Sequence, residues 1–295
     1  MPVAVLVSAP EGPALDSALL DMLRAEWGGG EVRWLAPGQA AEFPLERRPE
    51  IGADVAGLLD GRRIDVAFVP GEGRRKRLLV ADMDSTMIGQ ECIDELADEA
   101  GVGPRVAEIT ARAMNGELDF AGALRERVRL LEGLPAGVID HVLAHRITLA
   151  PGGETLLATM KAHGAHAALV SGGFVQFADE IARRLGFDEA RANRLEVREG
   201  RLTGRVHEPI LGRDAKLQAL EEISARLGIT PAAALAVGDG ANDLAMIERA
   251  GLGVALHAKP HVAARAPVSI RHGDLTALLY LQGYHRDEFV TPEEA

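Results

Sequence analysis

From residue 78 onward, short apolar runs alternate with segments that carry apolar residues at helical spacing, and this alternation strongly constrains the fold. The apolar runs are typical of strands and cover residues 78–81, 165–170, 233–237, 253–256 and 267–270. Helical periodicity lies between several of them, for example in residues 174–186 and 214–228. Such alternation predicts an α/β fold, a Rossmann-like parallel sheet with helices on both faces.

Two segments interrupt this alternation. Residues 193–206, "NRLEVREGRLTGRV", predict a hairpin that turns at Glu199 and Gly200. Between residue 91 and about residue 147 no strand pattern stands out, and four short amphipathic helices fit the sequence. The chain is therefore predicted to carry an all-helical insert of about residues 89–147 after the first strand of the sheet.

Residues 1–75 read as a separate small unit. Strand patterns at 3–9, 31–36 and 64–70 are interleaved with helical patterns at 14–27 and 51–59, and a third strand has no clear segment. This order predicts a ferredoxin-like βαββαβ unit. The boundary is placed at "GEGRRKR", residues 71–77, which leaves residues 76–295 as the second domain.

Composition excludes several classes of protein. The net charge of −12 argues against a nucleic-acid partner, since such proteins usually carry a basic surface. No apolar stretch approaches the roughly 20 residues that span a membrane, and the N-terminus lacks a basic, signal-like start. One cysteine, Cys92, allows no intramolecular disulfide. We therefore expect a cytoplasmic protein with no membrane or nucleic-acid partner.

Polar residues that can carry chemistry follow two of the predicted strands. Asp82 and Asp84 follow residues 78–81, and Ser171, Gly172 and Gly173 follow residues 165–170. Two crowded carboxylates repel, so they require a cation or a function that uses two protonation states. A Ser-Gly-Gly turn before a helix can hold an anion. Considered alone, each cluster is also explained by ordinary turn and cap preferences.

Two further clusters follow the same rule. Lys216 lies in the first turn of a predicted helix, where a lysine is electrostatically unfavourable unless an anion is near. Asp239, Asn242 and Asp243 follow the strand 233–237, and carboxylates around such a tight turn suit Mg²⁺. A surface lysine and a capped helix are the simpler alternatives. Together, however, the four clusters fall at strand–helix junctions of one sheet and supply the groups that phosphoryl transfer through an aspartyl-phosphate needs.

These clusters, in this order, resemble the motifs of the haloacid dehalogenase superfamily of phosphatases. The resemblance covers roughly residues 77–285 and rests on "DMDST", Ser171, Lys216 and "GDGANDLAM". Within that superfamily, "DMDSTMIGQECIDELA" and "AMNGELDFAGALRERVRLL" resemble the phosphoserine phosphatases. Residues 1–75 faintly resemble an ACT-like domain, although they carry no clear amino-acid-binding signature.

The resemblance implies a role for each core residue. Asp82 would be the nucleophile, Asp84 the general acid that protonates the departing seryl oxygen, and Lys216 a charge that keeps Asp82 ionised. Mg²⁺ would be held by Asp82, the backbone carbonyl of Asp84 and Asp239, with Asp243 in or near its shell. The phosphoryl oxygens would be held by Ser171, the amide of Gly172, and Asn242.

The helical insert would act as a cap that selects the substrate. By resemblance, Arg127 would bind the substrate carboxylate, Glu91 its ammonium, and Met114 and Phe120 would complete the recognition site. From the residues alone, Arg127 could lie on a solvated helix face and Glu91 could cap a helix. The implied reaction is hydrolysis of O-phospho-L-serine, the last step of serine biosynthesis. Hydrolysis or transfer of another small phosphate ester such as phosphohomoserine, and an amino-acid sensor, are alternatives. The oligomeric state is left open, with a homodimer as one option.

Overall fold

The computed structural model describes residues 1–114, 117–212 and 214–291, the side chain of Met114 excepted. The N-terminal unit contains β1 (Pro2–Ser8), α1 (Ser17–Trp27), β2 (Arg33–Ala36), β3 (Ala40–Pro44), α2 (Ala53–Gly61) and β4 (Ile64–Pro70). Its strands form an antiparallel sheet in the order β2-β3-β1-β4, the ferredoxin-like arrangement expected from the sequence. The strand that lacked a clear segment is β3.

The second sheet has six strands: β5 (Leu78–Ala81), β6 (His166–Phe174), β7 (Glu189–Asn193), β10 (Ala234–Gly238), β11 (Leu252–Leu256) and β12 (Val268–Ile270). All its pairings are parallel, in the order β12-β11-β10-β5-β6-β7. The prediction of a parallel sheet is therefore confirmed. The chain runs outward from β5 in one direction and returns to β10 on the other side of β5. The neighbouring strands β5 and β10 thus flank a topological switch point, the place where open α/β sheets bind ligands.

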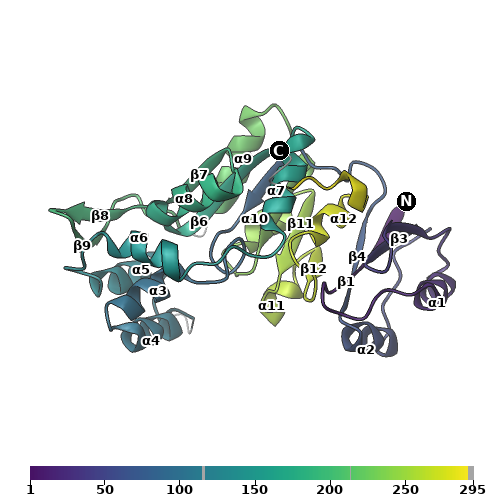
Figure 1. Ribbon diagram of the computed structural model, residues 1–295, viewed down its shortest axis with the longest axis horizontal. Coiled ribbons are helices and arrows are strands. Elements are labelled where there is room, and N and C mark those ends of the chain that lie inside the picture. The colour runs from purple at the N-terminus through teal and green to yellow at the C-terminus, as the bar shows by residue number, and fades with distance from the viewer. Residues whose placement is uncertain (115–116, 213, 292–295) are drawn as a thin grey trace.

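The expected helical insert follows β5. It contains α3 (Cys92–Glu99), α4 (Gly103–Met114), α5 (Phe120–Arg129) and α6 (Val138–His145). The predicted hairpin is also present, as β8 (Leu195–Arg198) and β9 (Arg201–Val206), and its turn residues Glu199 and Gly200 both have positive φ. In Figure 1 these helices and the hairpin lie together on one side of the sheet domain, and the N-terminal unit lies on the opposite side.

The remaining helices surround the parallel sheet. They are α7 (Gly153–Ala162), α8 (Val175–Leu185), α9 (Ala215–Arg226), α10 (Leu244–Arg249), α11 (Pro260–Ala263) and α12 (Ala277–Leu281), with short 3₁₀ turns at Pro231–Ala233 and Arg286–Glu288. The helix α8 shows the physical basis of this layer. Phe177, Ile181 and Leu185 recur at helical spacing and are buried, and Gly186 ends the helix in a left-handed conformation. Among the described residues, no helix is long and apolar enough to cross a membrane.

The N-terminal unit and the parallel-sheet domain share one hydrophobic core. Val5 and Ala67 from the small sheet belong to the same buried cluster as Leu278 and Tyr280. Buried polar contacts add to this junction, because the carboxylate of Asp65 on β4 accepts three consecutive backbone N–H groups, from residues 271, 272 and 273. The proposed boundary at residues 71–77 contributes as well, through Arg74, which pairs with the buried Glu42.

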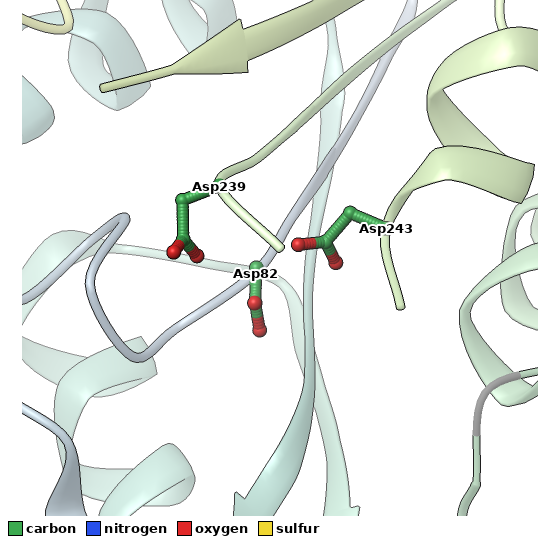
Figure 2. A group of neighbouring side chains, drawn as sticks. All are labelled: Asp82, Asp239 and Asp243. Atoms are coloured by element: carbon green, nitrogen blue, oxygen red, sulfur yellow. The ribbon is translucent and has the colours of Figure 1, made fainter. Parts of the chain in front are cut away.

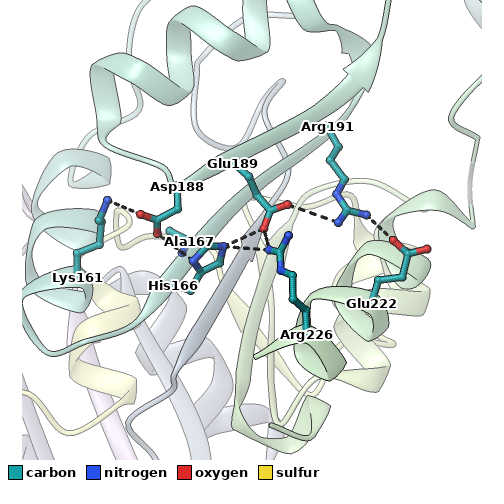
Figure 3. A network of polar contacts seen from close by, with 8 residues as sticks. All are labelled: Lys161, His166, Ala167, Asp188, Glu189, Arg191, Glu222 and Arg226. Atoms are coloured by element: carbon teal, nitrogen blue, oxygen red, sulfur yellow. Dashed lines mark hydrogen bonds and ion pairs between the residues drawn. The ribbon is translucent and has the colours of Figure 1, made fainter. Parts of the chain in front are cut away.

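The outer edge of the parallel sheet, at β7, carries a polar network. In Figure 3, Glu189 lies between His166 and Arg226, and Arg191 reaches Glu222 on α9. Lys161 on α7 pairs with Asp188 at 2.8 Å. These contacts lie where β6 and β7 begin, at the end of the sheet opposite to the carboxyl ends of the strands.

Candidate active site

The candidate site lies at the carboxyl ends of β5 and β10. Ala81 pairs with Val237, so the two strands end side by side, and the N–H of Asp82 continues the ladder by donating to the carbonyl of Val237 at 3.0 Å. Asp82 and Asp239 therefore emerge next to each other although 157 residues separate them in the chain. The register of this strand pair brings two of the predicted clusters together.

Asp82 and Asp243 share a buried lysine. The ammonium of Lys216 lies 2.7 Å from Oδ1 of Asp82 and 2.5 Å from Oδ1 of Asp243, and all three side chains are almost inaccessible to solvent. Oδ1 of Asp82 also accepts the N–H of Met83, so Oδ2 is its oxygen without a partner among the described residues. Lys216 thus fixes the orientation of Asp82 and leaves one oxygen of the carboxylate available.

The turn after β10 holds the Asp243 side chain against the backbone of Gly238 and Gly240. Its Oδ2 accepts the N–H of Gly240 at 2.9 Å, which closes the loop that holds Asp239. A side chain at Gly238 would place its Cβ 2.3 Å from Cγ of Asp243, so only glycine fits at this position. The glycines of "GDGAND" therefore let the Asp243 carboxylate pack against the end of the strand.

Three carboxylates converge at this point. Oxygens of Asp82, Asp239 and Asp243 lie within 4.8 Å of one another, and Figure 2 shows the three side chains approaching from two loops. Burial and the Asp243 carboxylate raise the pKa of Asp82 well above its ordinary value, against the opposing effect of Lys216. The same two causes raise the pKa of Asp239 to about 6. Because one ammonium faces three carboxylates, the donor set fits an additional cation with oxygen ligands.

Asp84 lies beside the last residues of β6, which continues through Ser171 and Gly172 to Phe174 instead of ending at residue 170 as expected. One of its oxygens accepts the N–H of Cys92 at 3.0 Å, and the other lies 3.5 Å from the hydroxyl of Ser171. The Ser171 hydroxyl accepts the N–H of Gly173 at 2.8 Å, and a Cβ at Gly173 would lie only 2.7 Å from Asp84. Burial raises the pKa of Asp84. Asp84 is thus placed beside Ser171, and its raised pKa favours a proton on it, while the ammonium of Lys216 holds Asp82 and opposes its protonation.

The helix α5 of the cap contacts the end of β6, next to Ser171. Its N-cap, Asp119, accepts the N–H of Gly122 and starts the helix at Phe120. The Phe120 ring lies directly over Gly172, since a Cβ built there would be 3.0 Å from the ring edge. Arg127, two turns later, donates to the carbonyl of Ala123 and has no ion pair with any described residue. Burial lowers the pKa of this guanidinium, and nearby carboxylates oppose the shift.

Glu91 begins the cap at the N-terminus of α3. Its carboxylate accepts a hydrogen bond from the hydroxyl of Ser85 at 2.7 Å, and Ser85 has a positive φ of 54°. Desolvation in the protein and the nearby Asp84 carboxylate raise the pKa of Glu91 to about 7. A cationic group in the cavity would therefore stabilise the ionised form of Glu91.

These residues line one cavity of about 500 Å³ between the cap and the sheet. The predicted site residues on its wall are Asp82, Asp84, Glu91, Phe120, Arg127, Ser171, Gly172, Asp239 and Asn242. Lys216 and Asp243 lie behind this wall and contact Asp82 or its neighbours. Met114 is the last residue of α4, and its side chain lies outside the described residues. The structure brings the predicted residues together, while their individual roles stay predictions.

The sequence analysis did not identify several residues of this site. Lys259 and His261 also line the cavity, and they come from the segment after β11. Asn193 holds the end of β6 in place, because its side chain donates to the carbonyl of Gly172 at 2.9 Å. Thr86 lies 3.4 Å from Asp239. Of these, only Thr86 lies within a quoted motif, and the others are brought near by the fold.

Comparison with known proteins identifies relatives of the chain. Residues 79–248 match the family model of the haloacid dehalogenase-like hydrolases. Over 243 aligned residues the chain is 49% identical to a phosphoserine phosphatase from Archaeoglobus fulgidus. The alignment covers 82% of this chain and 69% of that protein. Some longer phosphoserine phosphatases also match, and the chain then spans 55% or 52% of their length.

Solved structures resemble both the whole chain and its phosphatase part. A HAD family hydrolase from Salmonella enterica serovar Typhi superposes with a TM-score of 0.85 at 31% identity, covering 97% of this chain and 99% of the other. A substrate-bound phosphoserine phosphatase superposes with a TM-score of 0.65 at 42% identity, over 70% of this chain and 97% of the other. The first similarity includes the N-terminal unit.

Proposed function

Because the chain belongs to the haloacid dehalogenase-like hydrolases and, among them, to the phosphoserine phosphatases, we propose that it hydrolyses O-phospho-L-serine to L-serine and phosphate. One observation carries this proposal. Asp82, one of whose oxygens has no partner among the described residues, lines the same cavity as Arg127 and Glu91, a cation and an anion that suit the two ends of an amino acid. The reactive group and the recognition groups therefore face one small molecule.

In this proposal Asp82 attacks phosphorus through Oδ2. Lys216 holds the other oxygen and stabilises the ionised form of a carboxylate that burial would otherwise protonate. The phosphoryl oxygens bind at the turn of Ser171 and Gly172 and near Asn242, where backbone amides and side-chain donors can stabilise developing charge. The product of this step is an aspartyl-phosphate at Asp82.

Asp84 supplies the proton for the departing seryl oxygen. Its raised pKa favours the protonated form, which a general acid requires, and it lies at the same turn as Ser171. A serine alkoxide is a poor leaving group, so proton delivery contributes about 10²–10⁴-fold to the rate. The resulting carboxylate can then take a proton from the water that hydrolyses the aspartyl-phosphate.

We further propose that the cation at Asp82, Asp239 and Asp243 is Mg²⁺. Magnesium binds through one or two carboxylates and leaves positions for phosphate oxygens, and when bound it would neutralise charge on the transferred phosphoryl group. Asp82 and Asp239 face the cavity and would be direct ligands, with the backbone carbonyl of Asp84. Asp243 is already engaged by Lys216 and Gly240, so it would act mainly by holding the site together.

The cap would determine the substrate. Arg127 would bind the carboxylate and Glu91 the ammonium, while Phe120 closes over Gly172 and limits access of water. Met114 would complete the recognition surface. The same core chemistry would serve another small phosphate ester such as phosphohomoserine, whose chain is longer by one methylene. A cytoplasmic location, a homodimer and the domain boundary at residues 75–76 stay predictions.

A substrate panel tests the function. With Mg²⁺ present, phosphate release from O-phospho-L-serine should exceed that from phosphohomoserine and from phosphate esters without an amino-acid end. Arg127→Ala should lose activity mainly on phosphoserine. Arg125→Ala is the matched control, because Arg125 lies on the same helix and pairs with the exposed Glu208. Absence of phosphoserine hydrolysis, or full activity in Asp82→Asn, would refute the proposal.

A regulatory role for the N-terminal unit is a second candidate. It is supported by the expected ferredoxin-like sheet order of that unit, an arrangement that the sequence analysis linked to ACT-like domains. Calorimetric titration of the full chain with L-serine, compared with a variant that lacks the active-site Arg127, would separate binding at the two places. Heat that disappears with Arg127 would assign all binding to the active site.

A further inference from the structure

Lys259 is a cation in the active-site cavity that the proposed mechanism does not use. Its side chain lines the cavity together with that of His261. It is exposed, and it forms no ion pair or hydrogen bond through its ammonium with any residue that the structure describes. Its ammonium is therefore available to a ligand in the cavity.

An accessible cation matters in this cavity because carboxyl groups dominate its wall. Four carboxylates line the cavity, those of Asp82, Asp84, Glu91 and Asp239. Lys216 lies behind Asp82, and two carboxylates already compensate its charge. Even with the proposed Mg²⁺ at Asp82 and Asp239, an incoming phosphate dianion meets a wall that still carries the carboxyl groups of Asp84 and Glu91, on a chain of net charge −12. Such a wall repels the dianion unless accessible cations offset it.

The fold places Lys259 on the wall opposite to the cap. β11 pairs with β10 in register, Val254 beside Val237, so the segment after β11 emerges next to the loop that carries Asp239 and Asn242. Arg127 belongs to α5 of the cap, whereas Lys259 is the N-cap of α11 on the sheet side, and both line the cavity. Two unpaired cations thus occupy different walls, one in the cap and one beside the proposed phosphate site.

We propose that Lys259 attracts the phosphoryl group of the substrate to the sheet side of the cavity and so sets the direction in which the substrate binds. Arg127 then receives the carboxylate at the other end. This inference rests on the proposed function in one respect, namely that the ligand is a phosphate monoester. It assigns Lys259 to capture and orientation of the dianion and leaves attack and proton transfer to Asp82 and Asp84.

The test compares Lys259→Gln with two other variants. Lys259→Gln should lower kcat/KM for phosphoserine by about three- to tenfold at low ionic strength, as expected for one charge acting on a dianion across several ångströms of water. The decline of kcat/KM with added salt should become shallower, because screening then has less attraction to remove. Lys259→Arg keeps the charge and should restore both. Arg265→Gln removes an equal charge just beyond α11, where Arg265 pairs with the exposed Glu248, and should leave kcat/KM unchanged.

Inhibition by the two products locates the effect. Inorganic phosphate should inhibit Lys259→Gln more weakly than wild type by a similar factor, whereas the inhibition constant of L-serine should not change. An unchanged kcat/KM and salt dependence in Lys259→Gln would overturn the proposal. Equal losses in Arg265→Gln would overturn it too, since they would indicate an effect of overall charge. Weaker L-serine inhibition would place Lys259 at the amino-acid end and contradict the stated direction.

A general substrate separates this inference from the proposed function. If phosphoserine is not the substrate, hydrolysis of p-nitrophenyl phosphate should still show the reduced kcat/KM and the shallower salt dependence in Lys259→Gln. Loss of phosphoserine activity in wild type would then refute only the substrate assignment. An unaltered p-nitrophenyl phosphate reaction in Lys259→Gln would refute the role of the lysine.

Discussion

Replacing Asp65 by alanine should uncouple the N-terminal unit from the parallel-sheet domain. The Asp65 carboxylate is 5% exposed and accepts the N–H groups of residues 271, 272 and 273 at 2.8, 2.9 and 2.7 Å. A hydrogen bond to a charged group contributes about 1.5–3 kcal/mol, and such contributions are not additive. Because residue 271 is exposed and water can replace part of the loss, we expect a destabilisation of about 3–5 kcal/mol.

The chain carries a favourable probe for this experiment. Both of its tryptophans, Trp27 and Trp34, lie in the N-terminal unit, so their fluorescence reports on that unit, whereas far-UV circular dichroism reports on the whole chain. In wild type the two signals should change together in urea, because the two parts share a hydrophobic core. In Asp65→Ala the fluorescence midpoint should fall by more than about 1 M urea, for an m value of about 3 kcal/mol per molar.

Asp60→Ala is the matched control for this variant. Asp60 belongs to the same unit and contacts the side chains of Arg271 and His272, but its own side chain is 59% exposed. Exposed ion pairs contribute about 0–1 kcal/mol, so this variant should shift the midpoint only slightly. A shift in Asp65→Ala no larger than in Asp60→Ala would refute the reasoning, since it would show that the three buried hydrogen bonds do not stabilise the junction.

Three further predictions concern the active site. Lys216→Gln should abolish activity and cost about 3–5 kcal/mol near pH 7.5, because it leaves buried carboxylates without their ammonium. The raised pKa values of Asp82 and Asp239 mean that the folded state binds protons more readily than the unfolded state. Without the ammonium, which lowers both pKa values, these carboxylates would take up protons still more readily. The cost should therefore shrink as pH falls below about 6, measured by urea unfolding with Lys161→Gln as the surface control. The KM for phosphoserine should fall as pH rises through about 7, where Glu91 ionises. The Glu91→Gln variant should lose this pH dependence of KM. An identical pH profile in wild type and variant would contradict the ammonium-binding role of Glu91. Treatment with a chelator should abolish activity, and Mg²⁺ should restore it better than the larger Ca²⁺; full activity after chelation would exclude a metal requirement.

Much of the architecture follows from local patterns in the sequence. The strands β5, β10 and β11 are continuous apolar runs because both faces of a parallel sheet are covered, and they were predicted within one residue of their observed limits. β3 was expected without a clear segment and β7 was missed, because polar residues hide the strand pattern in both. β3 contains Glu42, whose buried carboxylate pairs with the guanidinium of Arg74. This partner is remote in sequence, so the local pattern does not indicate that a charged residue can be buried there. β7 is polar along most of its length, so nothing in its own sequence indicates that it joins a sheet.

The candidate site divides in the same way. Residues at the ends of strands could be grouped from sequence, because parallel strands bring their carboxyl ends to one edge of the sheet. Placing Glu91 and Arg127 at the same cavity required the resemblance to a family, since helical patterns do not fix how a cap packs on a sheet. Lys259 and Asn193 have no motif, and their place depends on the register of β11 against β10 and of β7 against β6. Such contacts are tertiary and leave no local signal.

The polar network at β7 has a consequence for how the protein behaves at high concentration. β7 is the outermost strand of the parallel sheet on that side, and an open strand edge can pair with the same edge of a second molecule. Here Glu189 and Arg191 alternate along the strand and are held by Arg226 and Glu222 (Figure 3). Two such edges would have to give up these ion pairs before their backbones could meet. The network therefore opposes aggregation through the β7 edge. At the opposite edge of the parallel sheet, β4 of the N-terminal unit lies against β12.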